Sequence, residues 1–306
     1  MIKGVVYRST GSWYTVKDAS GHFHQARIKG VFKIDDITST NPLAVGDMVE
    51  MERESETENT SVINTIVPRR NYINRQSPRF KNQHHIIAAN LDQSILFATL
   101  KEPRTSQGFI DRFLVVGEMY HVPSIIVFNK ADLYKKKEQE QFEEWKSMYE
   151  SIGYRLLLIS VKEKMGIEPL RALLKDKVSL LSGHSGVGKS SLINELLPEL
   201  VLRTKEVSGW SGKGLHTTTF AEMFDLPFGG AVIDTPGLRE LGIVDLPRQE
   251  LSHYYPEMRE RLGHCRFNNC LHINEPGCAI KEAVEQGQIY EERYASYFNI
   301  LNSLAS

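Results

Sequence analysis

The sequence lacks the features that mark a membrane or secreted protein. It contains no run of eighteen apolar residues, so no segment is typical of a transmembrane helix. The N-terminal residues 1–8 also lack the long apolar core of a signal peptide. We therefore expect a cytoplasmic protein without membrane contact.

An excess of charge of either sign is also missing. Lys and Arg together number 37 and Asp and Glu number 38, so the formal net charge is −1. This balance excludes a protein that coats nucleic acid through bulk positive charge, while local basic patches remain open. Neither an internal repeat nor a low-complexity segment occurs in the 306 residues, a length that favours two or three ordinary domains.

Cysteine is scarce, and its placement is informative. Cys265, Cys270 and Cys278 are the three cysteines of the chain, and they lie within fourteen positions that also contain His272. In a reducing compartment, three thiols and an imidazole at this spacing are typical of a closed structural zinc site. Redox-active or simply buried cysteines are the alternative. We predict one structural zinc ion per chain, bound between helical segments at 249–263 and 280–304.

Residues 183–190, Gly-His-Ser-Gly-Val-Gly-Lys-Ser, fit the pattern G-x-x-x-x-G-K-[ST]. An apolar run at 178–181 precedes them and an amphipathic segment at 191–197 follows, which predicts a strand, a tight loop and a helix. The backbone N–H groups of such a loop bind phosphate oxygens. Lys189 would reach the β- and γ-phosphates, and Ser190 would bind Mg²⁺. A glycine-rich turn with a chance Lys-Ser pair is the alternative.

The tetrapeptide Asn129-Lys130-Ala131-Asp132 follows an apolar run at 124–128 that predicts a strand. A carboxylate at Asp132 can accept hydrogen bonds from N1–H and the 2-amino group of guanine, and adenine offers neither donor. Alone this tetrapeptide is often a plain turn, but beside a phosphate loop in one α/β domain it indicates GTP. Ser160, after a predicted strand at 155–159, is a candidate for a second contact to the base through the backbone N–H groups of 160–162.

Asp234-Thr235-Pro236-Gly237 has the form D-x-x-G and follows an apolar run at 231–233. Asp234 would hold the Mg²⁺ shell, and the Gly237 N–H would sense the γ-phosphate. A Pro-Gly turn is the alternative. The next residue is Leu238, where many GTPases carry a glutamine that orients water, so we expect slow intrinsic hydrolysis.

A glycine-rich loop at 208–219 lies between the phosphate loop at 183–190 and the D-x-x-G motif at 234–237. Thr218 or Thr219 would bind Mg²⁺, because loops of this kind order around a γ-phosphate and its metal ion. His216 is either the group that replaces the missing glutamine or an ordinary exposed histidine.

Three domains are predicted from the pattern of strands and helices. Five short β-rich runs within 1–68 favour a small barrel, OB-like or SH3-like, with or without RNA contact. From residue 90 onward, strands alternate with helices, which predicts a mostly parallel sheet covered on both faces within 69–245. The helical metal-binding module takes 246–306. A basic stretch at 68–81, with five cations, either contacts RNA or is a solvated hinge.

The residues assigned to sites are the following. Those predicted to bind the nucleotide are Asn129, Lys130, Asp132, Ser160, Gly183, His184, Ser185, Gly186, Val187, Gly188, Lys189, Ser190, Ser191, Thr218, Thr219, Asp234 and Gly237. Ser190, Thr218 and Asp234 are predicted to hold Mg²⁺ with GTP, and Lys189 and His216 are the candidate catalytic residues.

The motifs stand in an unusual order, because the guanine motif precedes the phosphate loop. This order is a circular permutation of the small GTPase domain, which leaves the geometry of the site intact. A β-barrel, a permuted GTPase domain and Cys-x₄-Cys-x-His-x₅-Cys resemble, over essentially the whole chain, the bacterial ribosome small subunit-dependent GTPase A family. Val161 departs from the pattern, since small residues are usual after the serine.

The resemblance implies an OB-fold barrel, GTP hydrolysis stimulated by the small ribosomal subunit, a role in late maturation of that subunit, and RNA contacts from the barrel and the zinc module. The expected partners are the small subunit with its rRNA, and GTP or GDP, and the expected state is a monomer. The leading hypothesis is an assembly checkpoint whose release is coupled to hydrolysis. The alternatives are a nucleotide-gated RNA or ribosome-binding switch with incidental hydrolysis, and a P-loop kinase, against which 129–132 argues.

Overall fold

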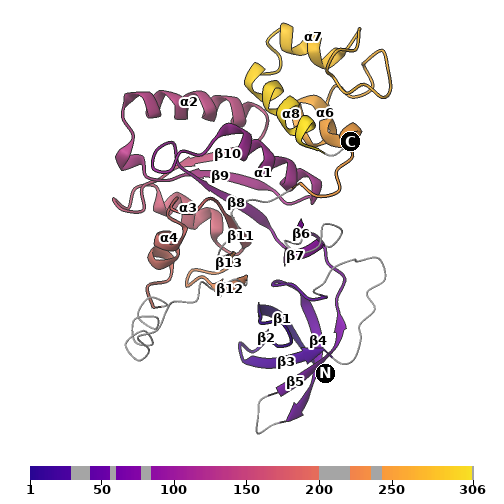
Figure 1. Cartoon of the computed structure of the whole chain (residues 1–306). Helices are drawn as coiled ribbons and strands as arrows, with labels where there is room; N and C mark the ends of the chain where they lie inside the picture. Colours follow the sequence, from indigo (N-terminus) through magenta and orange to yellow (C-terminus); the bar gives the residue numbers. More distant parts are fainter. Residues whose placement is uncertain (29–41, 56–59, 77–83, 200–220, 236–242, 305–306) are drawn as a thin grey trace.

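The computed structural model describes residues 1–28, 42–55, 60–76, 84–199, 221–235 and 243–304. Three parts follow one another along the chain: a β-barrel, a central α/β domain and a helical C-terminal module (Figure 1). None of the described helices has both the length and the apolarity that crossing a bilayer requires.

The N-terminal part is a closed five-stranded barrel. Strand β1 pairs with both β2 and β4, β2 pairs with β3, and β5 joins β3 in parallel and β4 antiparallel, which closes the circle. This order confirms the OB-fold. The strands are β1 Ile2–Ser9, β2 Tyr14–Asp18, β3 Phe23–Ile28, β4 Met48–Ser55 and β5 Thr60–Ile66. Alternate side chains point inward, among them Val6, Val16 and Ile63, and form a small apolar core.

The basic stretch after the barrel is not a simple hinge. Its residues 72–76 form β6 (Tyr72–Gln76), which pairs with β7 (His84–Ala89) in a separate two-stranded sheet. Arg69 donates to both Asp47 carboxylate oxygens at 2.6 Å, in a pair that is 9% and 0% exposed. Arg70 donates to Asp92 at 2.6 Å. Two of the cations that suggested RNA contact therefore have partners within the protein.

The central domain is a parallel sheet extended by one antiparallel strand. Its order is β10-β9-β8-β11-β13-β12, and all neighbours are parallel except β12 with β13. The strands are β8 Gln93–Ala98, β9 Ser124–Phe128, β10 Arg155–Leu158, β11 Val178–Ser182, β12 Glu222–Asp225 and β13 Ala231–Asp234. The parallel strands read as continuous apolar runs because both faces of the sheet are covered.

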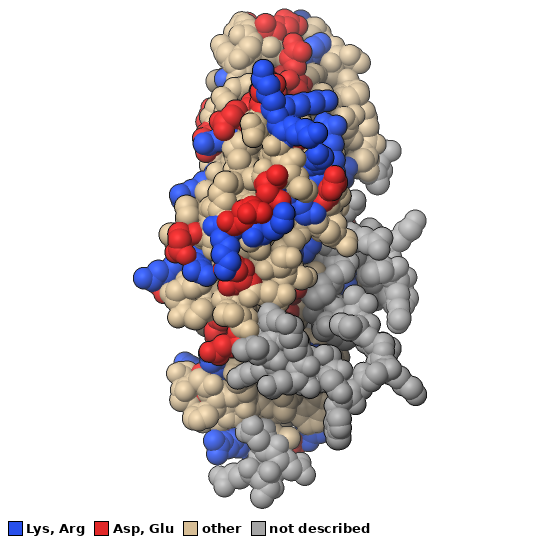
Figure 2. Space-filling model, turned by 90° about the vertical axis from the view of Figure 1, so that its left-hand side faces the viewer, with Lys and Arg blue, Asp and Glu red and all other residues tan. Residues whose placement is uncertain are grey.

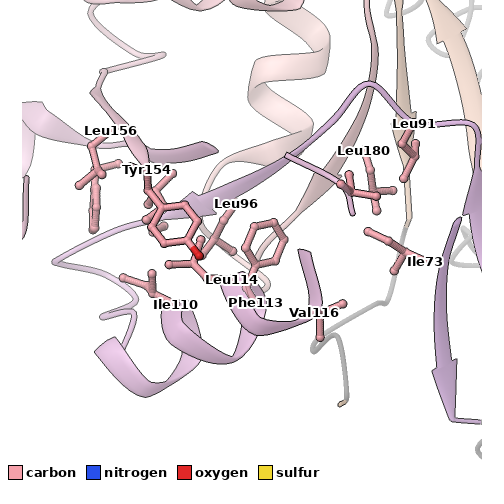
Figure 3. Close-up of a cluster of buried hydrophobic side chains, with 14 of the residues drawn as sticks. Ile73, Leu91, Leu96, Ile110, Phe113, Leu114, Val116, Tyr154, Leu156 and Leu180 are labelled. Carbon is pink, nitrogen blue, oxygen red and sulfur yellow. The ribbon is translucent and has the colours of Figure 1, made fainter. Parts of the chain in front are cut away.

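Helices cover the two faces in pairs. Helices α1 (Gln107–Met119) and α2 (Lys136–Ser151) pack on one face, where Phe113, Leu96 and Leu156 belong to one apolar cluster (Figure 3). Helices α3 (Ile167–Leu174) and α4 (Lys189–Leu196) pack on the other face around a second cluster. The prediction of a mostly parallel sheet with helices on both faces is confirmed.

The barrel and the central sheet are joined by strand pairing. β1 of the barrel pairs antiparallel with β12, the edge strand of the central sheet. The Tyr7 hydroxyl donates to Asp225 at 2.6 Å across this junction, and Lys17 pairs with the same carboxylate. The two parts therefore share one continuous run of eleven strands.

The C-terminal module is built from short helices within the two predicted helical segments. The 3₁₀ helix η2 (Arg248–Tyr254) and α6 (Pro256–Arg259) take the place of the helix predicted at 249–263. The helical segment predicted at 280–304 consists of two helices, because α7 (Ala279–Glu285) ends before Gly287, which has a φ of 69°, and α8 (Glu291–Ser303) starts anew.

A buried ionic cluster fastens this module to the central domain. Arg293 of α8, only 1% exposed, pairs with Asp111 of α1 and with Glu257 of α6, and its Nε lies 2.7 Å from the Glu257 carboxylate. The Tyr149 hydroxyl donates to Asp111 at 2.7 Å, and the Tyr255 ring lies 4.5 Å from the guanidinium carbon. Each charge has an opposite partner, which is the condition for burying it.

Charge of both signs is spread over the surface. On the face that Figure 2 shows, basic and acidic side chains lie next to one another, with the largest gathering of basic side chains in the upper part. This distribution agrees with the net charge of −1 and provides local basic patches without a uniform field.

We predict that Arg293→Met destabilises the fold by about 3–5 kcal/mol, because two carboxylates are left buried without a counter-charge. Urea unfolding followed by circular dichroism measures the change. Arg27→Met is the control, since Arg27 is 52% exposed and pairs with Glu54 at the surface. We expect the control to unfold like the wild type. Equal midpoints for the two variants would contradict the role given to the cluster.

Candidate functional site

Three sequence motifs meet at one edge of the central sheet. β9, β11 and β13 are parallel in the sheet, so their carboxyl ends point the same way. The segments 129–133 and 183–190 follow directly after the ends of β9 and β11, and Asp234 is the last residue of β13. Ligands of open α/β sheets bind at this edge, which makes it the candidate nucleotide site.

The phosphate loop connects β11 to α4 and depends on two glycines. Gly183 has a φ of 145°, and a Cβ there would collide with the carbonyl of Phe97. Gly188 has a φ of 103°, caps the N-terminus of α4, and leaves room for the Asn129 amide where a Cβ would stand. The loop thus ends in the N-terminus of a helix, whose free N–H groups favour an anion. Ser185, Gly186, Ser190 and Ser191 are exposed on it.

Lys189 and Asp234 form the charged part of the site. The Lys189 ammonium is half-buried and donates to the carbonyls of Gly183 and of His184, the latter at 3.0 Å. Burial lowers the pKa of Lys189, with Asp234 acting in the opposite direction. Burial likewise raises the pKa of Asp234, with Lys189 opposing. A bound anion would therefore stabilise the charged form of Lys189, and a bound cation would stabilise the charged form of Asp234.

The Asp234 side chain fits a bound cation in one further respect. Its Oδ1 is buried and has no hydrogen-bond partner among the described residues. A carboxylate oxygen of this kind is a suitable ligand for Mg²⁺ or for one of its bound waters, because Mg²⁺ takes six oxygen ligands in octahedral geometry.

The side chain of Asn129 connects the motifs. It is 3% exposed, and its Nδ2 donates to the carbonyl of Val187 in the phosphate loop at 2.9 Å. Its Oδ1 accepts from the backbone N–H of Val161 at 3.1 Å. One amide therefore fixes the phosphate loop and the segment after β10 relative to the end of β9.

Asp132 lies on the short helix η1 (Ala131–Leu133) and is held by Ser160. The Ser160 hydroxyl donates to Asp132 Oδ1 at 2.6 Å, and the Lys162 ammonium lies 3.7 Å from Oδ2. The hydrogen bond from Ser160, aided by Lys162, lowers the pKa of Asp132 although burial opposes it. The carboxylate is thus kept ionised and able to accept hydrogen bonds.

Ser160 was predicted as a source of backbone contacts to the base. In the structure its own N–H bonds to the Met165 carbonyl at 3.0 Å, and the N–H of Val161 bonds to Asn129. The Ser160 hydroxyl therefore holds the Asp132 carboxylate in place, and its contact to the base stays a prediction.

Several predicted site residues lie outside the described part of the chain. His216, Thr218, Thr219 and Gly237 belong to this group, and their roles stay predictions. The structure brings the others together at the sheet edge, from Asn129 to Asp132, from Gly183 to Ser191, and at Ser160 and Asp234.

A segment that sequence reasoning did not select also borders the site. The loop 99–105 after β8 lies beside the site. The Lys130 ammonium donates to the Glu102 carbonyl, and the Pro103 ring faces Gly186, so that a Cβ added at Gly186 would contact this ring. The Phe109 ring in α1 stacks on the His184 ring, with centroids 3.7 Å apart. No local motif marks these residues, because they reach the site through the fold.

The predicted metal ligands converge in the C-terminal module. The ligand atoms of Cys265, Cys270, His272 and Cys278 all lie within 4.8 Å of one another. Cys265 Sγ and Cys278 Sγ are 4.0 Å apart, and they lie 3.6 and 3.4 Å from His272 Nδ1. A tetrahedral zinc ion with bonds of about 2.0–2.3 Å requires ligand separations of about 3.5–3.8 Å. The four ligand atoms therefore lie close to the separations that zinc requires, and the widest must close by at most about 1 Å.

The surroundings of the thiols support the same assignment. Burial raises the pKa of the Cys278 thiol, so a thiolate at this position needs a cation beside it.

Glu275 arranges the loop that carries the ligands. Its carboxylate accepts from the backbone N–H groups of Leu271 and Ile273, both at 2.8 Å, and of Asn274 at 3.0 Å. Burial raises the pKa of Glu275, but these donors outweigh it and the net shift is downward. The acidic residue in Glu275-Pro276-Gly277 thus shapes the backbone between the second and the last thiol.

Comparisons with known proteins agree over the whole length of the chain. A family model described as RsgA GTPase matches residues 66–244, and one described as RsgA N-terminal domain matches residues 3–63. A protein of Cytophaga hutchinsonii named small ribosomal subunit biogenesis GTPase RsgA is 51% identical over 300 residues, 98% of each chain.

Two solved structures have the same arrangement. YjeQ from Thermotoga maritima is 36% identical, with a TM-score of 0.80 over 99% of this chain and 98% of that one. YloQ, described as a circularly permuted GTPase, is 30% identical, with a TM-score of 0.75 over 99% of this chain and 94% of that one.

We expect Glu275→Gln to weaken zinc binding about tenfold, because one acceptor oxygen that orders the ligand loop is lost. Competition with a chromophoric chelator measures the affinity, and metal analysis should find one zinc ion per wild-type chain. Glu282→Gln is the matched control, since Glu282 is exposed on α7. Equal zinc affinities of the two variants would contradict the role given to Glu275.

Proposed function

The chain belongs to the RsgA GTPase family and is a GTP hydrolase, and on this premise we propose that it acts in late maturation of the small ribosomal subunit. In this proposal the GTP-bound protein docks on the immature subunit through its rRNA. Hydrolysis is triggered there and promotes release. The names of the relatives support the partner, and the motif set supports the reaction.

The observation that carries the proposal is the double hydrogen bond of the Asn129 amide. It links the phosphate loop at Val187 and the segment at Val161 to the loop that bears Asp132. A phosphate-binding element and a base-reading carboxylate are therefore held in one frame, as a guanine nucleotide requires. A kinase for a small metabolite would need no such carboxylate.

The residues of the site divide the work in this proposal. The N–H groups of 183–190 cradle the phosphates, and Lys189 moves from its loop carbonyls to the β- and γ-phosphate oxygens. Ser190 and Asp234 hold the magnesium ion, together with Thr218 or Thr219. When bound, Mg²⁺ neutralises charge on the transferred phosphoryl group. Asp132 accepts from the guanine edge.

The unassisted site should be slow. Leu238 follows Gly237, and a leucine side chain offers no group to orient water. We propose that contact with the small subunit completes the site, with His216 as the candidate group that positions water.

The zinc module and the barrel are proposed to provide the RNA contacts. In this proposal zinc is held by Cys265, Cys270, His272 and Cys278 and stabilises the module, whose apolar cluster includes two of these thiols. We propose a monomer with domains at 1–68, 69–245 and 246–306.

Asp132→Asn should weaken GTP binding by about 100-fold or more, since two hydrogen bonds to a charged acceptor are lost. The new amide can donate to the 2-oxo group of xanthine, so affinity for xanthosine triphosphate should rise. Equilibrium binding of fluorescent analogues measures both. Asp176→Asn is the control, because Asp176 is exposed at the opposite edge of the sheet, before β11. Unchanged preference for GTP in Asp132→Asn would contradict the base assignment.

GTP turnover of the purified protein should be slow alone and rise by at least about tenfold with purified small ribosomal subunits. Large subunits serve as the control partner, and Lys189→Ala, which loses the contact to the β- and γ-phosphates, should show no turnover under either condition. Absence of stimulation by small subunits would rule out docking as the trigger.

A further inference from the structure

Helix α1 contacts the nucleotide site at one end and the zinc module along one side. It begins directly after the loop 99–105, with Ser106 as its N-cap, and its residue Phe109 stacks on His184 of the phosphate loop. Figure 1 shows α1 between the central sheet and the C-terminal helices. Its sequence contains no nucleotide or metal motif, so the functional assignments above leave it without a role.

Helix α1 contacts the zinc module through a buried ion pair, an apolar side chain and an exposed ion pair. Asp111 of α1 is fully buried and pairs with Arg293 of α8. One turn further, Val115 lies in the same apolar cluster as Cys270 and Cys278. At the far end of α1, Glu118 accepts from Arg259 at 2.8 Å.

Helix α8 in turn holds the loop with the zinc ligands. The Tyr294 hydroxyl donates to the His272 carbonyl at 2.6 Å, and the Tyr297 hydroxyl donates to the Leu271 carbonyl at 3.0 Å. Both tyrosines lie within four positions of Arg293 on the same helix. A continuous series of contacts therefore runs from the zinc ligands through α8 and α1 to the phosphate loop.

The contact of α1 with α8 is more rigid than its contact with the phosphate loop. Sliding α1 past α8 would separate Asp111 from Arg293 and leave buried charges uncompensated, so these helices are expected to move together. At the other end, Phe109 meets a loop that contains three glycines, through a ring stack that is only partly buried. This contact can change at low cost when the phosphate loop closes around a nucleotide.

We propose that α1 couples the phosphate loop to the zinc module, with Phe109 as the positioning residue at the loop and Asp111 with Arg293 as the positioning pair at the module. The inference rests on the proposed function in one respect, namely that GTP occupies the phosphate loop. Coupling of this kind is reciprocal: GTP restrains the zinc module, and restraint of the module by a bound partner tightens the phosphate loop around GTP. The route is independent of the segment 236–242, which joins the two parts along the chain.

The test is hydrogen exchange of the full-length, zinc-loaded protein with and without a saturating non-hydrolysable GTP analogue. In the wild type we expect the analogue to slow exchange in α8 and in the ligand loop by about fivefold, the lower end of common coupling factors. In Phe109→Ala we expect the analogue still to bind at saturation and the protection of α8 to disappear.

Two further variants sharpen the test. Phe298→Ala truncates an aromatic side chain that is 38% exposed on α8 itself, and it should keep the protection. Arg293→Lys keeps the buried charge but loses the forked donor geometry, and it should reduce the protection of α8. If Arg293→Lys fails to fold, Phe109→Ala alone decides.

The outcomes separate this inference from the proposed function. Full protection of α8 in Phe109→Ala, or no protection in a wild-type protein that binds the analogue and responds to small subunits, would overturn the coupling alone. A wild-type protein that binds no GTP would overturn the proposed function and the coupling with it.

Discussion

The side chain of Asn129 is the contact on which the nucleotide site depends. Its amide bonds to Val187 and Val161 and so holds together three loops that come from separate parts of the chain. Gly188 must be a glycine to leave room for this amide, and Ser160 comes close enough to fix Asp132 because Val161 is held. A buried amide with both hydrogen-bonding groups satisfied is rigid, and rigidity is what a base-reading carboxylate needs to discriminate.

The C-terminal module is held by three interactions of different kinds. Its four ligands fit zinc, Glu275 orders the loop between them, and Arg293 fastens α8 to α1. The apolar cluster of the module includes two of the thiols and Val115 of the neighbouring domain, so the module completes its core with metal and with α1. The zinc site and the nucleotide domain are therefore parts of one packing unit.

The barrel is joined to the rest of the protein by strand pairing and by an internal ion pair. β1 extends the sheet through β12, and Arg69 is buried against Asp47 of the barrel. A stretch of cations that suggests RNA in the sequence is thus partly used for internal pairing. Composition reports which charges a segment has, but the pairing of Arg69 depends on an aspartate 22 positions earlier that only the folded barrel brings near.

The sequence by itself determined the fold class, the motif set with its permuted order, and the four candidate zinc ligands, because each of these depends on spacing over a few residues or on periodicity. Leu238 is likewise read from the sequence alone, and the choice between Thr218 and Thr219 as a magnesium ligand stays open. Tertiary structure decided the strand β6, the break between α7 and α8, and the contacts of Ser160 and Glu275. Strand β6 needs β7 as a partner, and Ser160 needs Asp132. The Asp111–Arg293 pair and the Phe109–His184 stack join residues 182 and 75 positions apart. No local pattern carries such contacts, because they arise only when α1 packs between the sheet and α8.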